Sequence, residues 1–421
     1  MANTERDNYI VIGGSGFLGR HIVEALLKRG DAVSVLDIVQ RYHDVPFHSA
    51  DISVQSQVED AFRKACSGAT CIIHTASPPH GLDPAIYWKV NVEGTKAVLA
   101  AATVLHIKKL VFTSSAGVVF NGQDIIDVDE RLPFPETPLD AYNESKSKAE
   151  ELVLDANGKD GLLTVALRPA GIFGPGDRQA MHGLMQVFDN RQTHFQIGDN
   201  NNLFDWTYVT NVAKAHLLAA DRLSHPREDL DEAKLQPLRP VDLSTGVRRV
   251  PTSHARPIGP AVVAPSNAAE FEERFKNEEA YEPRPIARHR FDQLSEAVIE
   301  RTESEPLRVD GQVFFITNGE PVYFWDFMRA VWHEMGDPLD RKTLKLPKYL
   351  GSALATLAEG WGWLIGKEPA FTRFRVTFAC ATRWHNIEKA RLVLGYEPDV
   401  GVVEGVKMMC DWYKAEHPKK Q

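Results

Sequence analysis

Near its N-terminus the chain reads Tyr9-Ile-Val-Ile-Gly-Gly-Ser-Gly-Phe-Leu-Gly19, a short apolar run that leads directly into a glycine-rich turn. The apolar run predicts a buried β-strand, and the residues after the turn predict a helix. Glycines at such a junction let the backbone approach a pyrophosphate, whose charge the free N–H groups of the helix start stabilise. We therefore expect a bound dinucleotide, with contacts from Gly13, Ser15, Gly16, Phe17 and Leu18.

Asp37 ends the second expected strand, about 20 residues beyond the glycines, where an acidic residue accompanies this kind of turn. A carboxylate there accepts the ribose hydroxyls of NAD and repels the extra phosphate of NADP. The alternative is that Asp37 is an ordinary polar strand end and that Arg41 accommodates a phosphate. We predict NAD as the cofactor.

Short β-branched runs alternate with helical patterns over the first 175 residues, which is typical of successive βαβ units. The predicted fold class is therefore α/β: a Rossmann-like doubly wound parallel sheet with a smaller C-terminal substrate-binding lobe. The expected strands are Tyr9–Ile12, Ala32–Asp37, Phe47–Ala50, Thr70–Thr75, Lys109–Thr113 and Leu163–Leu167, and the expected helices are Gly16–Arg29, Val54–Lys64, Ala85–His106 and Ala141–Asp155.

The composition changes between residues 226 and 306, where ten prolines stand among dense charge. Proline disrupts both helices and sheets, so we interpret this segment as a mostly irregular, flexible insertion with one helix over Ala268–Ala280. We expect an NAD-binding Rossmann domain over residues 1–225, which adds part of the substrate site from about residue 170. After the insertion, a strand over Gln312–Thr317 begins a C-terminal substrate lobe at 307–421.

Tyr142 and Lys146 lie four residues apart in an expected helix, so their side chains share one face. An ammonium beside a phenol favours the phenolate and lowers the pKa of the tyrosine, which lets it take a proton from an alcohol. Ser115, at the end of an expected core strand, can hydrogen-bond the same substrate oxygen. This spacing also arises by chance on surface helices, but its combination with the glycine turn, Asp37 and Ser115 argues against chance.

Together these motifs resemble the short-chain dehydrogenase/reductase superfamily in its extended form, over about residues 8–224 and 308–415. The resemblance implies that Ser115, Tyr142 and Lys146 are catalytic and that Tyr142 and Lys146 also contact the cofactor. It further implies that residues matching the adenine and nicotinamide segments line the cofactor channel, with Asn91 as a brace. These further cofactor residues are Asp51, Ile52, Thr75, Ala76, Ser77, Pro169, Gly171 and Ile172.

Four blocks resemble the 3β-hydroxysteroid dehydrogenase branch more closely, and within it the members that act on sterols with a 4-carboxylate. They are Ala76–Gly81, Thr113–Gln123, Ala166–Gln179 and Gln196–Trp206. The resemblance implies NAD-dependent oxidation of a sterol 3β-hydroxyl with decarboxylation at C4. A cation should bind the substrate carboxylate, and we nominate Arg178, with Lys89 as the alternative. Arg178 could instead form a purely structural salt bridge with Asp177 or Asp199.

Other functions remain open at this point. The substrate could be an uncarboxylated 3β-hydroxysteroid or a nucleotide sugar, although the aromatic C-terminal region suits an apolar ligand. Its aromatic residues are Phe324, Trp325, Phe327, Trp361, Trp363, Phe371 and Phe374, which at helical spacing are more often plain core. A silent NAD-binding sensor or scaffold would ordinarily lack the tyrosine or the lysine, and both are present.

The composition limits which kinds of partner we expect. A net charge of −9 argues against nucleic acid, which requires a basic surface, and the four cysteines show no spacing typical of a zinc site or a disulfide framework, so we expect no metal. The polar N-terminus predicts no signal peptide. Tyr349–Ile365 is apolar but interrupted, which fits a buried helix or an interfacial one.

The family resemblance implies a sterol partner, a peripheral place on the cytosolic face of the endoplasmic reticulum membrane, and contact with other C-4 demethylation enzymes; a cytoplasmic location is the alternative. It also implies a homodimer that pairs through Ala85–His106 and Ala141–Asp155.

Overall fold

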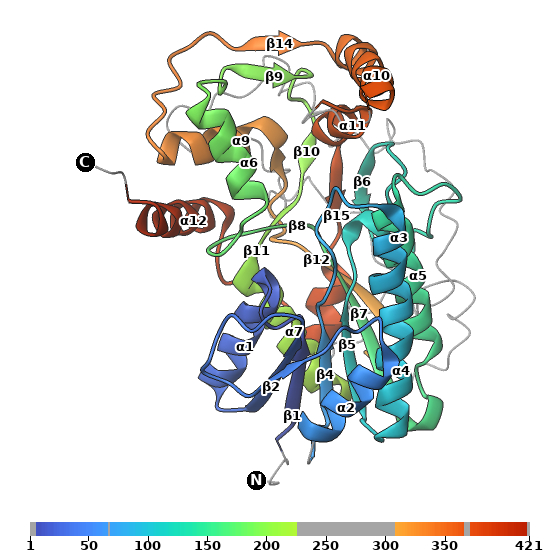
Figure 1. Cartoon of the computed structure of the whole chain (residues 1–421). Coiled ribbons are helices and arrows are strands. Elements are labelled where there is room, and N and C mark those ends of the chain that lie inside the picture. The colour runs from blue at the N-terminus through green and yellow to red at the C-terminus, as the bar shows by residue number, and fades with distance from the viewer. Residues whose placement is uncertain (1–5, 66–67, 225–307, 366–370, 419–421) are drawn as a thin grey trace.

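The computed structural model describes residues 6–65, 68–224, 308–365 and 371–418 (Figure 1). The expected insertion at 226–306 and its helix over Ala268–Ala280 lie outside the described residues. In the described ranges, none of the helices combines the length and the hydropathy needed to span a bilayer.

A seven-stranded sheet forms the lower part of the molecule, and all of its neighbouring strands are parallel (Figure 1). In sheet order the strands are β12 (Gln312–Ile316), β7 (Leu163–Pro169), β5 (Lys109–Thr113), β4 (Cys71–His74), β1 (Asn8–Ile12), β2 (Ala32–Asp37) and β3 (Phe47–Ser49). The order reverses beside β1, and ligands of such sheets bind at the carboxyl ends of the strands near this point.

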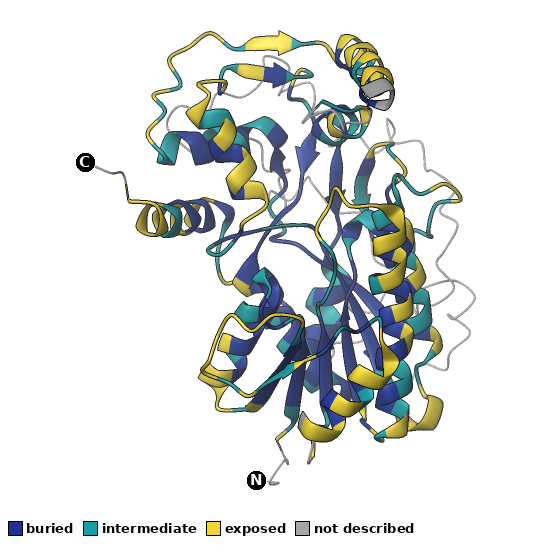
Figure 2. Ribbon diagram, viewed as in Figure 1, coloured by how far each residue is buried: buried dark blue, intermediate teal, exposed yellow. Residues whose placement is uncertain are grey.

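Helices cover both faces of this sheet, and the side chains of β1 alternate between them. Tyr9 and Val11 pack with α1 (Phe17–Arg29) and α7 (Val209–Ser224), whereas Ile10 and Ile12 face the other layer. That layer contains α2 (Gln55–Ala65), α4 (Gly94–Val104) and α5 (Ala141–Asp155). The sheet is consequently buried on both sides (Figure 2), which explains why its strands read as continuous apolar runs.

The expected α/β fold class is confirmed. The six expected strands are present with shifts of a few residues at their ends, and the four expected helices correspond to observed ones. The region predicted as one helix over Ala85–His106 is divided into α3 (Pro84–Tyr87), a π-helical turn over Trp88–Glu93 and α4. Such turns often occur at functional sites, and this one contains Asn91.

The upper part of the molecule is built from three separate stretches of the chain. Its largest sheet has the order β13 (Val322–Tyr323), β10 (Leu203–Phe204), β15 (Arg383–His385) and β6 (Ile125–Val128). Two smaller parallel pairs join β8 (Gly171–Phe173) to β11 (Trp206–Tyr208) and β9 (Phe195–Ile197) to β14 (Leu344–Leu346). The helices are α6 (Ala180–Asp189), α9 (Phe324–Glu334), α10 (Lys348–Ile365), α11 (Arg373–Cys380) and α12 (Val402–Glu416).

The division at residue 307 differs from the observed path of the chain. The strand that we expected to begin the C-terminal lobe, β12, instead pairs with β7 as the edge strand of the large sheet. Its sequence, Gln312-Val-Phe-Phe-Ile316, is buried throughout, as a strand in a doubly covered sheet requires.

Candidate functional site

The glycine turn after β1 forms a tight cradle at the start of α1. A Cβ at Gly13, whose φ is +82°, would lie 2.8 Å from the backbone of Ala76, and one at Gly19 would lie 2.1 Å from the carbonyl oxygen of Gly13. Gly16 caps α1 without a side chain, so the first N–H groups of the helix remain free of a side-chain cap. The cradle therefore has the close backbone approach and the open helix start that a pyrophosphate needs.

Asp37 lies beside this cradle at the end of β2. Its carboxylate accepts the backbone N–H of Ser15 at 3.0 Å and that of Ile38 at 2.7 Å. Farther along the same side, Asp51 accepts two hydrogen bonds from Ser53, which lower the pKa of its carboxyl group. These two acids give one end of the site the acceptors that ribose hydroxyls require.

Tyr142 and Lys146 lie on the first two turns of α5, one helical turn apart. Lys146 is buried, donates to the carbonyl oxygen of Thr113, and lies 4.3 Å from the centre of the Phe112 ring. The ring of Tyr142 packs against His80, with 4.0 Å between the ring centres, and against Tyr87 at 5.6 Å. The helix thus places a phenol and an ammonium against the end of β5.

The pKa of Tyr142 moves in the direction opposite to our expectation. Burial raises it to about 12, against a lowering contribution from the Ser77 hydroxyl. Burial also lowers the pKa of Lys146 to about 7, although Glu150 opposes this shift. The expectation left out the loss of water around both groups, which disfavours the charged form of each and is the largest cause of both shifts.

Ser115 follows β5 and caps the short helical turn Ala116–Val119, where its hydroxyl accepts the N–H of Gly117 at 3.0 Å. The preceding Ser114 points elsewhere and donates to Glu150. Glu150 and Arg168 form an ion pair with both side chains fully buried, at 3.0 Å between Nε and Oε2. This pair ties α5 to β7 directly behind the site.

Asn91 bridges two parts of the site, as a brace would. Its side-chain oxygen accepts the Ser77 hydroxyl at 3.0 Å, and its amide donates to Ser145 at 2.9 Å. Ser145 in turn donates to the carbonyl oxygen of Tyr142 at 2.8 Å. The segment after β4 is thereby fixed relative to the first turn of α5.

One cavity of about 2150 Å³ brings the predicted residues together at the carboxyl ends of the large-sheet strands. Its lining includes every residue that we assigned to catalysis or to the cofactor: Gly13, Ser15, Gly16, Phe17, Leu18, Asp37, Asp51, Ile52, Thr75, Ala76, Ser77, Ser115, Tyr142, Lys146, Pro169, Gly171 and Ile172. Arg41 and Arg178 also line it, whereas Lys89 lies outside the lining and 4.0 Å from Asp51.

The cavity continues between the elements of the upper part, where its wall is aromatic. Phe324, Trp325, Phe371 and Phe374 line it. Phe327 instead stacks on Trp206 in the upper core, at 3.9 Å between ring centres. Trp361 is 64% exposed on α10, and the side chain of Trp363 lies outside the described residues. Four of the seven aromatic residues are therefore placed to line the cavity.

Sequence reasoning gave no role to several basic residues of the cavity lining, among them Arg383 and His80. Arg383, on β15, and His80, after β4, both line the cavity. Arg383 carried a signal, because it is the single charged residue in the run Val376–Trp384. His80 lies inside a block that we quoted for the resemblance, without a role of its own.

Comparison with known proteins supports the same family. The sequence pattern of the 3-beta hydroxysteroid dehydrogenase/isomerase family matches residues 10–234. The sterol-4-alpha-carboxylate 3-dehydrogenase, decarboxylating, of Candida albicans is 39% identical over 96% of both chains. That of Schizosaccharomyces pombe is 38% identical over 97% of this chain and 98% of its own.

Among solved structures, the Thermus thermophilus UDP-glucose 4-epimerase in complex with NAD has a TM-score of 0.56 and 20% identity, over 97% of this chain and 99% of its own. At that identity the likeness shows the fold alone. The family match and the near full-length relatives go further, and the chain belongs to the 3-beta hydroxysteroid dehydrogenase/isomerase family.

Proposed function

We propose that this protein oxidises the 3β-hydroxyl of a 4α-carboxysterol to a ketone with NAD and that the product loses its carboxylate as carbon dioxide. The observation that carries the proposal is the single cavity that joins a glycine cradle, a tyrosine–lysine pair and an aromatic wall. A sterol is a rigid apolar body, which suits that wall. The near full-length relatives named for this reaction support the same substrate class.

The cofactor is proposed to be NAD, with the glycine cradle, Asp37 and Asp51 as its adenosine-side contacts and Lys146 and Ile172 near the nicotinamide. Gly13 and Gly16 carry no side chains, which leaves room for the cofactor at the cradle. The carboxylate of Asp37 would repel the additional phosphate of NADP. When bound, the oxidised nicotinamide accepts the hydride that leaves C3.

The chain's own residues handle the proton. The raised pKa of Tyr142 keeps its hydroxyl protonated at neutral pH, so it meets the substrate oxygen as a hydrogen-bond donor or acceptor together with Ser115. Removal of the alcohol proton by the phenolate requires a neighbouring positive charge, and protonated Lys146, one helical turn away, is the residue suited to supply it.

Decarboxylation follows from the product of oxidation. A 3-keto-4-carboxylate is a β-keto acid, and breaking the bond between C4 and the carboxylate sends its electron pair toward the ketone oxygen. Hydrogen-bond donors aimed at that oxygen stabilise the developing enolate. Ser115 and protonated Tyr142 are both suited to this role, since each carries a hydroxyl and lines the cavity.

The experiment supplies purified full-length protein with a 4α-carboxy-3β-hydroxysterol and either NAD or NADP, and follows reduced cofactor by absorbance and sterol by mass spectrometry. We expect one NADH and one decarboxylated ketone per sterol, little reaction with NADP, and loss of turnover in Tyr142→Phe. Tyr208→Phe is the matched control, because that hydroxyl donates to the sulfur of Met408 at 3.4 Å and the residue lies outside the cavity lining. Activity confined to uncarboxylated steroids or nucleotide sugars would overturn the substrate assignment.

We also propose that α10 rests on a membrane surface, so that a sterol enters from the lipid. Its exposed face carries large apolar side chains, with Tyr349 76%, Leu357 72% and Trp361 64% exposed (Figure 2). Such a face suits the interfacial region of a bilayer. Co-flotation with lipid vesicles should decrease in a Leu357→Ser/Trp361→Ser variant, and unchanged flotation would refute the proposal.

A further inference from the structure

Arg383 is buried in a cage of aromatic rings on β15. The carbon of its guanidinium lies 4.0 Å from the centre of the Phe378 ring, 4.4 Å from that of Phe120 and 4.6 Å from that of Phe204. Only 9% of the residue is exposed. Three rings hold the planar group in one orientation and favour its charge through their π faces.

The guanidinium lacks the anion that its burial demands. Its Nε and Nη2 are buried and have no hydrogen-bond partner among the described residues. Burial lowers its pKa to about 9, and the acid that opposes this shift, Asp140, already caps α5 by accepting the N–H of Asn143 at 2.7 Å. A buried arginine without an ion-pair partner is costly unless a ligand supplies the negative charge.

Arg383 also lies near the groups that act on the substrate hydroxyl. Burial lowers the pKa of His80, and the charge of Asp140 opposes that shift. The charge of Arg383 lowers the same pKa further, so the guanidinium and the imidazole are close. The His80 ring packs on the ring of Tyr142 at 4.0 Å. All three residues line the same cavity.

We propose that Arg383 binds the carboxylate of the substrate and so selects carboxylated sterols over neutral ones. The inference rests on the proposed function, in which the carboxylate is borne by C4, the carbon next to the one whose hydroxyl Tyr142 meets. A guanidinium matches a carboxylate through two parallel N–H···O bonds, which fix orientation as well as charge.

Arg383 suits this role better than Arg178, our earlier nominee. Arg178 is exposed, and its charge is screened by water. The alternative of a salt bridge from Arg178 to Asp177 is not favoured. The Asp177 carboxylate instead accepts the N–H groups of Gln179 at 2.8 Å and Ala180 at 3.0 Å. A cation in the drier aromatic cage attracts a carboxylate more strongly.

The contribution of Arg383 should appear in binding rather than in bond cleavage. During decarboxylation the negative charge leaves the carboxylate group, so a cation paired with that group stabilises the reactant more than the transition state. Arg383 is therefore a specificity-determining residue: it distinguishes ligands before the chemical steps begin.

The test uses a matched pair of ligands, a 4α-carboxy-3β-hydroxysterol and its methyl ester, which differ mainly in charge. Dissociation constants for the full-length protein are measured by tryptophan fluorescence with NADH present, so that no oxidation occurs. We expect Arg383→Met to weaken binding of the acid by about 10- to 100-fold, the usual range for a lost charge-assisted hydrogen bond, and to change binding of the ester by no more than about threefold. Arg383→Lys should retain part of the preference for the acid.

Three results would overturn the assignment: equal losses for acid and ester, no loss for either, or loss of the preference for the acid in Arg178→Met instead. The melting temperature of each variant shows whether it folds, and Arg383→Lys gives a second reading if Arg383→Met does not. Turnover separates this inference from the proposed function. Charge-selective binding through Arg383 without oxidation would remove only the function, and decarboxylating turnover with an unchanged preference in Arg383→Met would remove only the Arg383 assignment.

Discussion

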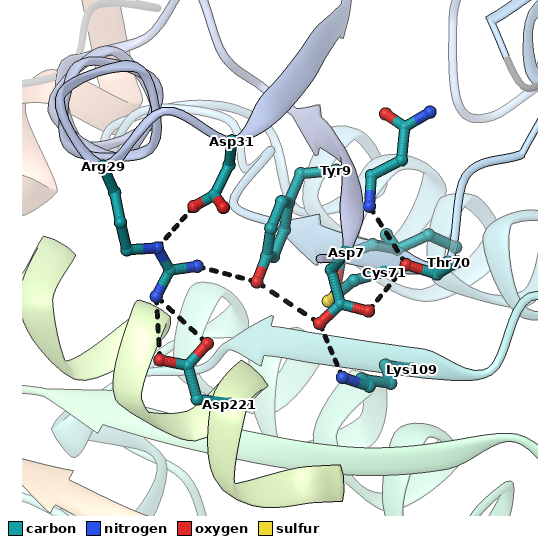
Figure 3. Close-up of polar contacts among 10 residues, drawn as sticks. Asp7, Tyr9, Arg29, Asp31, Thr70, Cys71, Lys109 and Asp221 are labelled. Atoms are coloured by element: carbon teal, nitrogen blue, oxygen red, sulfur yellow. Dashed lines mark hydrogen bonds and ion pairs between the residues drawn. The ribbon is translucent and has the colours of Figure 1, made fainter. Parts of the chain in front are cut away.

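Several cationic side chains at the two ends of the large sheet differ in the partners that they contact. At the amino ends of β1, β4 and β5, Arg29 donates to Asp221 at 2.8 Å, to Asp31 and to the Tyr9 hydroxyl, while Lys109 donates to Asp7 at 2.6 Å (Figure 3). Near the carboxyl ends, Lys146 donates to a backbone carbonyl, and the guanidinium of Arg383 lies among three aromatic rings, with two of its nitrogen atoms lacking a hydrogen-bond partner among the described residues. In the described part of the chain, Lys146 and Arg383 thus lack the carboxylate partners that Arg29 and Lys109 have, although Arg20 and Arg168, near the same end, are ion-paired.

The pKa values reflect the same contrast. Burial alone would lower the pKa of Arg29, but Asp31, Tyr9 and Asp221 together raise it above its ordinary value. Burial lowers the pKa of Lys146 to about 7 and that of Arg383 to about 9. Each shift is opposed by one acid, Glu150 for Lys146 and Asp140 for Arg383, and neither acid offsets the effect of burial. The carboxyl end therefore carries an energetic cost that the amino end avoids, and removing a cation at each end should have different consequences.

The largest expected effect follows from Lys146→Met. We expect turnover of the sterol to fall by about 10²- to 10⁴-fold, because Tyr142 loses the charge that makes its phenolate accessible. The melting temperature should stay at the wild-type value or rise, since the variant no longer buries an ammonium against the Phe112 ring. Steady-state NADH formation and thermal unfolding measure the two outcomes, and a variant that is both active and less stable would break the contrast between the two ends.

Arg168→Met tests a buried, fully paired cation at the carboxyl end. Both side chains of the pair that it forms with Glu150 have 0% exposure, so the variant leaves a buried carboxylate without its partner. We expect a loss of about 3–5 kcal/mol in the free energy of unfolding, measured with urea. The double variant Glu150→Leu/Arg168→Met is the control and should regain most of that loss. Equal stability of the two variants would show that the loss does not come from the unpaired carboxylate of Glu150.

Local patterns in the sequence were sufficient to predict the dinucleotide cradle and the catalytic helix. The apolar run before Gly13 and the four-residue spacing of Tyr142 and Lys146 each depend on neighbours within one strand or one turn. Both therefore predicted lining residues of the cavity correctly. The roles of those residues stay predictions until turnover is measured.

What the sequence could not predict depends on contacts between distant segments. Arg383 reaches the cavity because β15 pairs with β10 and β6, which lie about 180 and 255 residues earlier. The direction of the Tyr142 pKa depends on burial, with smaller contributions from distant residues: the Ser77 hydroxyl lowers the pKa and Tyr87 raises it. The place of β12 in the large sheet depends on its pairing with β7 across the segment that we expected to be an insertion.

A pH titration sharpens the contrast through Lys146. Between its folded-state pKa of about 7 and its ordinary value of 10.5, the unfolded chain holds a proton that the folded protein lacks. The contribution of Lys146 to the free energy of unfolding therefore rises with pH through that window, by at most about 1.4 kcal/mol per pH unit. Urea unfolding at pH 7.5 and 9.5 should show wild type gaining about 2 kcal/mol relative to Lys146→Met. Parallel changes in both proteins would mean that Lys146 has an ordinary pKa.

The smallest expected effect is at the amino end. Asp7→Asn removes the charge that pairs with Lys109, whose side chain is 9% exposed against 15% for Asp7, so water screens the loss more than it does for Arg168. We expect about 1–2 kcal/mol less stability and kcat/KM within about twofold of wild type, because this cluster lies at the end of the sheet opposite the cavity. Asp411→Asn, in a pair 45% and 59% exposed at 3.8 Å, is the control and should change neither quantity. If Asp7→Asn lowered kcat/KM as much as it lowered stability, the two ends of the sheet would be coupled, and the separation of structural from ligand-binding charges would no longer hold.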